Sequence, residues 1–172
     1  DPMLIHAQAA GATLEPEHTV VVAGHGAEAV TKAALAHDEE ATVVVQSEEL
    51  GTGQAVAQAR DALNGFKGIA IVLYGDTPFV SPETLERMMQ AAATTDVVVL
   101  GFEAADSGRY GRLVMDGPSL ERIVEFKDAN IAERAITLCN SGVIACNAAL
   151  LFDLIDAVGN DNASGDDFLY NI

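Results

Sequence analysis

The sequence predicts an α/β fold of three layers, built on a mostly parallel sheet and followed by a mixed C-terminal section. Through the first hundred residues, short β-branched runs alternate with alanine-rich segments of helical periodicity. The β-branched runs are continuously apolar, which is typical of parallel strands covered by helices on both faces. After Glu103 this rhythm stops, and runs separated by turn residues follow. Strand–helix alternation followed by paired strands therefore predicts the fold class.

The first half of the chain supplies three strands and three helices. The third helix opens at Ser81, whose side chain suits the capping position, with Pro82 at the first helical position and Glu83 near the positive helix end. The predicted strands are 19–23, 41–46 and 69–74, and the helices are 27–36, 54–63 and one that starts at 81.

The second half begins with a fourth strand and then changes character. Asp116 and Gly117 are a turn signal that divides 111–126 into two strands. The segment 136–146 is interpreted either as a further strand pair or as one bent strand, and the pattern leaves both open. The fourth strand is predicted at 96–103, and a final helix at 148–158 has Leu151, Leu154 and Ile155 on one side.

Length and charge exclude several classes of protein. At 172 residues the chain suits one domain with a sizeable core, so we expect 1–172 to be a single domain. The net charge of −17 argues against nucleic-acid binding, because a phosphate backbone requires basic patches. No apolar run approaches the roughly 18 residues of a membrane span, and the N-terminus lacks the basic flank of a secretory signal. The missing initiator Met leads us to expect that the chain begins inside a longer protein.

The cysteines and histidines show no disulfide or metal pattern. Cys139 and Cys146 are seven residues apart and form no CxxC pair. We expect both to pack in the core of a cytoplasmic protein, where thiols stay reduced. The four histidines have no ligand spacing among themselves or with the cysteines, so we expect satisfied or surface side chains.

Five short stretches place polar residues where strands are predicted to end, and four of the five also contain glycine. In one of them a single carboxylate, Asp76, follows a buried strand. Ligands of parallel α/β sheets gather at the carboxyl ends of strands. Gly, Asp and Pro are also common turn residues, so each stretch taken alone is more often structural than functional. The five are QSEELGTGQA (46–55), LYGDTPF (73–79), GRYGRL (108–113), VEFKDA (124–129) and CNSGV (139–143).

In this order and spacing, the five stretches resemble the sugar-phosphate nucleotidyltransferases along essentially the whole chain. The similarity is strongest to the uridylyltransferase domains of the bacterial bifunctional N-acetylglucosamine-1-phosphate uridylyltransferases/glucosamine-1-phosphate acetyltransferases, and LGTGQA and LYGDTP are its most specific parts. The resemblance implies a Rossmann-like nucleotidyltransferase sheet. It also implies Mg²⁺-dependent transfer of a uridylyl group from UTP to N-acetylglucosamine-1-phosphate. The products would be pyrophosphate and UDP-N-acetylglucosamine for the cell envelope.

The resemblance implies that the first stretch recognises the base. Gln46 would bind uracil, since an amide offers both a donor and an acceptor to an edge that carries both. The rival interpretation is a strand-end amide bonded to the backbone. Gly51 and Thr52 would bring the backbone close to the base, which the missing glycine side chain permits.

The second stretch is implied to hold the metal. Tyr74, Gly75 and Asp76 would line the nucleotide site, and Asp76 would be the catalytic residue that holds Mg²⁺. A hard carboxylate oxygen suits a cation placed against phosphate oxygens.

The last three stretches are implied to bind the sugar. The backbone of Gly111 would face the substrate, Glu125 would accept hydrogen bonds from sugar hydroxyls, and Asn140 would bind sugar or ribose. For Glu125 the rival interpretation is an ion pair with Lys127, which contributes little at a surface. For Asn140 the rival is a simple turn before Gly142.

Three basic residues of the second half, Arg109, Arg112 and Lys127, either offset phosphate charge or form a solvated face, and both interpretations stay open. The family also carries segments that these 172 residues lack. They are an upstream Gly-rich loop with an Arg and a Lys, a downstream Asn that is the second metal ligand, and a β-helix acetyltransferase domain. Through that last domain the full-length family is expected to form a homotrimer. The tail 166–172 departs from the family pattern, and we expect the fragment alone to be inactive.

Three functional hypotheses remain. The chain is part of the uridylyltransferase, a nucleotide-sugar-binding module without turnover, or a nucleotidyltransferase for another base or sugar. The upstream loop distinguishes the first hypothesis from the second. Gln46 with LGTG favours uracil over cytosine, whose edge replaces a carbonyl by an amino group.

Overall fold

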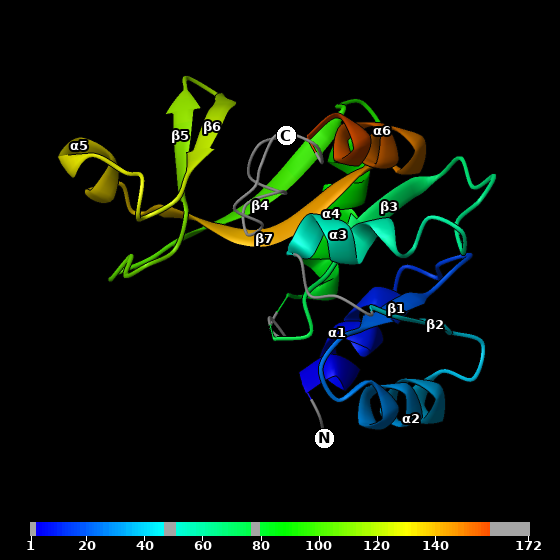
Figure 1. The fold of residues 1–172 in the computed structure, drawn as a ribbon. Coiled ribbons are helices and arrows are strands. Elements are labelled where there is room, and N and C mark those ends of the chain that lie inside the picture. Colours follow the sequence, from blue (N-terminus) through cyan, green and yellow to red (C-terminus); the bar gives the residue numbers. More distant parts are fainter. Residues whose placement is uncertain (1–2, 47–50, 77–79, 159–172) are drawn as a thin grey trace.

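The computed structural model describes residues 3–46, 51–76 and 80–158. These residues form six helices and seven strands, of which β7 is the long central strand of the larger sheet (Figure 1). The elements in chain order are α1 (Met3–Ala12), β1 (Val20–Ala23), α2 (Ala27–His37), β2 (Thr42–Val45), α3 (Thr52–Ala57), β3 (Ile69–Val72), α4 (Pro82–Ala92), β4 (Val97–Glu103), β5 (Arg112–Asp116), β6 (Ser119–Val124), α5 (Ile131–Arg134), β7 (Leu138–Asn147) and α6 (Ala148–Val158).

The strands form two sheets. β1 and β2 pair in parallel, from Val20 opposite Thr42 to Ala23 opposite Val45. The second sheet has the order β3-β7-β5-β6, with β4 paired to the other edge of β7. β7 is antiparallel to both β3 and β4. β3 and β4 therefore run in the same direction, as the strand–helix alternation predicts, but β7 lies between them.

Helices cover both faces of this sheet, which confirms the three-layer α/β class. Alternate residues of β3 face opposite sides. Ala70 and Val72 pack with α6 residues such as Leu151, whereas Ile69 and Ile71 pack with α4 residues such as Leu85. Figure 1 shows α6 and α4 on the two sides of β7.

One predicted helix differs from the structure, and the structure decides between the two interpretations of 136–146. The helix expected at 54–63 begins earlier, at Thr52, and ends at Ala57. Its continuation runs through shorter turns, in which Ala59 N donates to Val56 O and Arg60 N donates to Ala57 O. In the segment 136–146 the structure has one strand, β7 (Leu138–Asn147), rather than a pair, so the interpretation as one bent strand is confirmed.

Other local predictions are confirmed. Ser81 caps α4, since its side chain accepts a hydrogen bond of 3.2 Å from the backbone N–H of Thr84. Cys139 and Cys146 are free and buried in β7. Among the described residues, none of the helices is both long enough and apolar enough to span a bilayer.

Candidate active site

The predicted metal ligand lies where the sequence places it, directly after the carboxyl end of β3. Gly75 and Asp76 form an exposed turn between β3 and the segment that leads to α4. Within the described ranges, no group of three His, Cys, Asp or Glu side chains is arranged to hold a metal. Asp76 offers a single carboxylate, which fits Mg²⁺ because this ion binds through one or two carboxylates together with substrate phosphates and water.

Tyr74 joins this turn to the central strand. Its ring lies against Gly142 of β7, where an added β-carbon would be 2.9 Å from Tyr74 Cε2. Gly142 has a φ of +84°, a conformation that glycine adopts without strain. Tyr74 also packs against the core cluster that contains Ile144 and Leu151. The position of the Tyr74 ring is thus fixed from two sides.

β7 bulges at the residues that contact Tyr74. From Val99 to Gly101 the chain of β4 advances two residues, while its partners on β7, Ile144 and Asn140, are four residues apart. Bulges of this kind often accompany functional sites. In the bulge, the Oδ1 atom of Asn140 accepts a 2.9 Å hydrogen bond from the backbone N–H of Gly142. Asn140 is a buried residue of β7, and its side chain makes the local bond to Gly142 that the turn interpretation expects, so its role as a ligand of the sugar stays a prediction.

The three predicted sugar-binding residues come together beside this bulge. The backbone N–H of Asn140 donates a 2.9 Å hydrogen bond to Gly111 O. A β-carbon at Gly111 would lie only 2.5 Å from Glu125 Oε1, so the carboxylate occupies the space that the glycine leaves open. Gly111 precedes β5 and Glu125 follows β6, and the pairing of Arg112 with Val124 brings the two strand ends side by side.

The predicted base-binding residues lie at the end of β2 and the start of α3. The backbone N–H of Gln46 donates to Ala23 O at 2.8 Å, which extends the parallel ladder by one bond. The side-chain Nε2 of Gln46 donates to Gln54 Oε1, so its amide is bonded to a side chain of α3 rather than to the backbone. The sequence reasoning missed Gln54, although its place in the LGTGQA stretch was the available signal.

Gly51 and Thr52 form the turn into α3. Gly51 has a φ of +102°, and its carbonyl accepts a 3.1 Å bond from Ala55 N. The Oγ1 atom of Thr52 is buried and has no hydrogen-bond partner within the described part of the chain. A buried hydroxyl without a partner costs about 1–3 kcal/mol, so this atom is suited to bond a ligand.

The neighbouring residues 47–50 of this stretch lie outside the described residues, as do Thr77 to Phe79 and the predicted divergent tail 166–172.

Arg112 differs most from what the sequence predicts. The solvated-face interpretation is wrong for this residue, because Arg112 is only 2% exposed. Arg109 and Lys127, in contrast, are exposed. The sequence carried no signal for this difference, since arginines are seldom fully buried and all three lie in similar turn-rich stretches.

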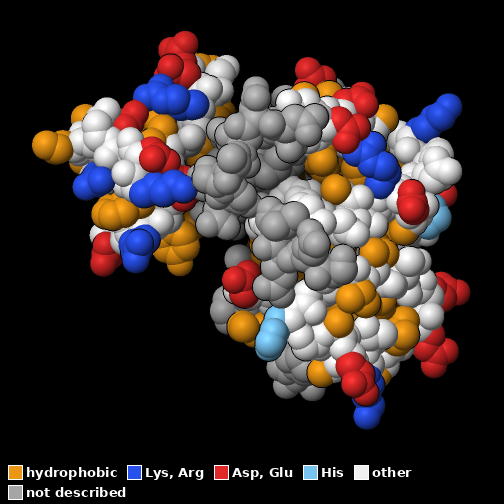
Figure 2. Space-filling view, viewed as in Figure 1, with side chains coloured by type: hydrophobic (Ala, Val, Ile, Leu, Met, Phe, Trp, Pro, Cys, Tyr) orange, Lys and Arg blue, Asp and Glu red, His pale blue; other side chains and the backbone are white. Residues whose placement is uncertain are grey.

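Lys and Arg residues are concentrated in the segment that contains Gly111 and Glu125. Five of the nine Lys and Arg residues fall between 105 and 136, a segment that holds six of the 26 acidic residues. Figure 2 shows these basic side chains over the lobe made by β5, β6 and α5. This segment is nearly neutral in a chain of charge −17, so it contributes little to the repulsion that an anion meets.

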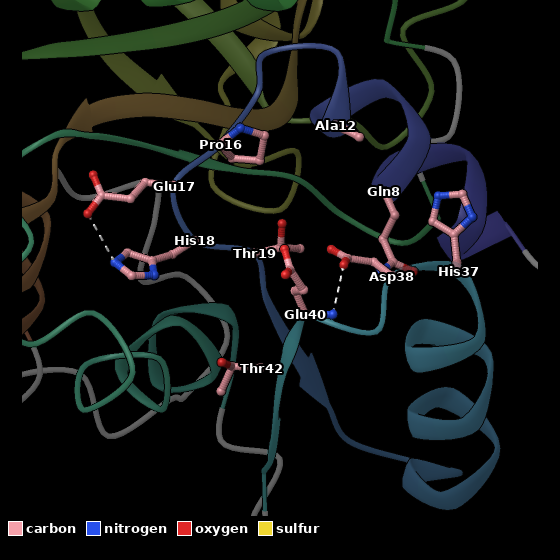
Figure 3. A pocket seen from close by; sticks show the side chains of 10 residues that line it. All are labelled: Gln8, Ala12, Pro16, Glu17, His18, Thr19, His37, Asp38, Glu40 and Thr42. Carbon is pink, nitrogen blue, oxygen red and sulfur yellow. Dashed lines mark hydrogen bonds and ion pairs between the residues drawn. The ribbon is translucent and has the colours of Figure 1, made fainter.

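A cavity of about 300 Å³ lies elsewhere, at the amino ends of β1 and β2 (Figure 3). None of the predicted site residues borders it. His18 contacts Glu17 at 3.6 Å, and both side-chain amide atoms of Gln8 are buried without a partner among the described residues. The cavity is lined by Gln8, Ala12, Pro16, Glu17, His18, Thr19, His37, Asp38, Glu40 and Thr42.

Comparison with solved structures shows that other proteins share this fold. A UDP-glucose pyrophosphorylase complexed with UDP-glucose superposes with a TM-score of 0.74 at 16% identity, over 99% of this chain and 73% of the other. HddC from Yersinia pseudotuberculosis superposes with a TM-score of 0.65 at 20% identity, over 94% of this chain and 66% of the other.

The chain belongs to the MobA-like NTP transferase domain family, whose model matches residues 1–152. It is 67% identical over 171 residues to the bifunctional protein GlmU of Ruegeria pomeroyi and 64% identical to that of Roseobacter denitrificans. In both cases the match covers 99% of this chain and 38% of the relative, so the chain spans little more than a third of these proteins. The resemblance stated from the five stretches is thereby confirmed.

Proposed function

We propose that this chain is the part of a nucleotidyltransferase that binds UTP and N-acetylglucosamine-1-phosphate and positions them for uridylyl transfer. The convergence of Gly111, Glu125 and Asn140 beside Tyr74 carries the proposal. These residues come from three separate stretches of the chain, and β7 holds them next to the end of β3. The family membership and the relatives named GlmU support the same reaction class.

The proposed reaction is an in-line displacement at phosphorus. A phosphate oxygen of the sugar phosphate forms a bond to the α-phosphorus of UTP, and the bond between that phosphorus and the bridging oxygen of pyrophosphate breaks. The attacking oxygen is already anionic, so no side chain has to remove a proton. The chain would contribute by holding two anions in line and by excluding alternative geometries.

Each half of the site has a separate task in this proposal. Gln46, with its amide oriented by Gln54, would bond the uracil edge, and Thr52 Oγ1 would supply a further hydrogen bond. Glu125 would accept from sugar hydroxyls above Gly111. Asp76 would hold Mg²⁺, which when bound neutralises charge on the phosphates.

The proposal extends to location and assembly. Two buried free cysteines support a cytoplasmic protein. The relatives are far longer than this chain, and we propose that the full-length protein forms a homotrimer through a domain downstream of these residues. Light scattering on the full-length protein tests the assembly, and a monomeric mass would contradict it.

The proposed activity is tested by pyrophosphate release from the full-length protein that carries this chain. UTP with N-acetylglucosamine-1-phosphate is expected to give the fastest release, ahead of CTP, dTTP or glucose-1-phosphate in otherwise equal mixtures. A preference for another base or sugar would show a related nucleotidyltransferase instead. Binding of UDP-N-acetylglucosamine without pyrophosphate release from any mixture would show a binding module.

A further inference from the structure

The buried guanidinium of Arg112 holds together two segments next to the proposed sugar site. Its Nη1 atom donates to the carbonyls of Ser107, at 3.3 Å, and Tyr110. Its Nη2 atom donates to Gly108 O at 3.1 Å and to Arg134 O at 3.5 Å. The first three carbonyls belong to the loop that ends at Gly111, and the fourth belongs to the end of α5.

The positive charge of Arg112 is stabilised by the four carbonyl groups that it bonds and by the aromatic ring of Phe126. Its guanidinium carbon lies 5.8 Å from the centre of the Phe126 ring, which Arg134 also approaches, at 4.6 Å. None of the ion pairs found among the described residues includes Arg112. Burial of a charged group is costly unless it is hydrogen-bonded. The four carbonyls must therefore stay in place for Arg112 to remain buried, and this requirement couples the loop to the core.

Arg112 is also directly linked to the residues that form the site. Gly111, its neighbour, accepts the hydrogen bond from Asn140 N and faces Glu125 Oε1. Phe126, which lies beneath the guanidinium, is the residue after Glu125. The side chain of Arg112 thus bonds the backbone that precedes Gly111 and contacts the ring of Phe126, which follows Glu125.

We propose that Arg112 is a positioning residue, which sets the separation between the Gly111 backbone and the Glu125 carboxylate for a sugar phosphate. This inference rests on the proposed function. Arginine is required because its planar fork presents donors in several fixed directions, whereas a lysine ammonium is a point charge on a flexible stem. A lysine at this position retains the charge but loses the simultaneous bonds to the loop and to Arg134 O.

The test compares Arg112→Lys with wild type in the full-length protein. The KM for N-acetylglucosamine-1-phosphate is expected to rise about tenfold or more, because small displacements of positioning groups have large effects. The KM for UTP and the kcat at saturation of both substrates are expected to stay within about twofold, since the base-binding residues lie on other elements. Equal rises in both KM values, or no rise in either, would overturn the proposal.

Arg134→Gln is the matched control. It removes the other cation over Phe126 but leaves the Arg134 carbonyl that Arg112 bonds, so the KM for the sugar phosphate should not change.

If Arg112→Lys does not fold, Phe126→Leu serves as the second variant. It removes the ring and leaves the carbonyl bonds, and it should raise the KM for the sugar phosphate about twofold to fivefold. A folded Phe126→Leu protein with unchanged KM values would then overturn the proposal. Failure of the wild-type protein to release pyrophosphate would instead refute the proposed function itself.

Discussion

The ring of Tyr74 lies so close to Gly142 that a β-carbon at position 142 would be 2.9 Å from Tyr74 Cε2. Gly142→Ala is expected to destabilise the protein by about 2–3 kcal/mol, from the φ of +84° and the clash together. Urea unfolding measures the loss. Gly117→Ala is the control, because Gly117 also has a positive φ but nothing lies within 4 Å of its added β-carbon. Equal losses in the two variants would contradict the role of the Tyr74 contact.

Asp76→Asn is expected to reduce uridylyl transfer by the full-length protein to near zero and leave its fold intact. Asp76 is exposed, so its replacement should change the free energy of unfolding by no more than about 0.5 kcal/mol. Pyrophosphate release and thermal unfolding are measured together. Asp96→Asn, a change at another exposed acid just before β4, should leave the rate unchanged. Near-normal turnover of Asp76→Asn at saturating Mg²⁺ would refute the metal assignment.

Glu125→Ala and Asn140→Ala are expected to raise the KM for the sugar phosphate much more than the KM for UTP. Gly111→Ala should have the same effect, because its β-carbon would displace the Glu125 carboxylate. Steady-state kinetics with each substrate varied in turn gives both constants. Glu121→Ala, at an exposed position of β6, is the control and should change neither. Equal changes in the two KM values would show that these residues act only through the fold.

Gln46→Ala is expected to raise the KM for UTP about fivefold to tenfold, which corresponds to the loss of one hydrogen bond of about 1 kcal/mol. Gln54→Ala should act in the same direction, because it releases the Gln46 amide. Gln58→Ala is the matched control, since the side chain of Gln58 donates to the backbone carbonyl of Gln54, at 3.5 Å, and not to the amide that Gln46 bonds. A larger effect on the sugar phosphate than on UTP would contradict the assignment of Gln46 to the base.

Stability at high pH should depend on Cys146. Burial raises the pKa of its thiol from 9.0 to about 11. Between about pH 9 and pH 11 the folded chain therefore keeps this proton, whereas the unfolded chain releases it. The contribution of Cys146 to the free energy of unfolding is fully present below about pH 9 and falls as the pH rises toward 11. The loss amounts to at most about 1.4 kcal/mol per pH unit. The stability difference between wild type and Cys146→Ala should accordingly shrink between pH 8 and pH 10. A constant difference in urea unfolding would contradict the shift.

Local sequence patterns predicted most elements because each depends on its own residues. The apolar runs of β3 and β4 and the Ser81 cap of α4 are such features. The position of β7 between β3 and β4 could not be predicted in this way. Alternating strands and helices indicate the direction of a strand, whereas the identity of its neighbour depends on contacts between segments far apart in the chain.

The same distinction applies to the site. The position of Asp76 in a turn after a strand could be predicted, because it depends on the neighbouring residues alone. The burial of Arg112 depends on carbonyls from the 107–110 loop and from α5, which only the folded chain brings together. The bond from Gln46 to Gln54 likewise joins a strand end to a helix.

The bulge of β7 carries contacts of the candidate site that the backbone pairing of β7 does not require. In the pairing of β4 with β7, Val99 lies opposite Ile144, and Gly101 lies opposite Asn140. β7 therefore has two more residues than β4 between these pairs, and Ser141 and Gly142 have no pairing partner on β4. A shortened relative without Ser141 and Gly142 would keep every pairing partner of β7, yet it would lose the backbone on which Tyr74 rests and the N–H that Asn140 Oδ1 bonds. The extra length of β7 at this point therefore shapes the surroundings of Tyr74 and Asn140 rather than the backbone pairing of the sheet.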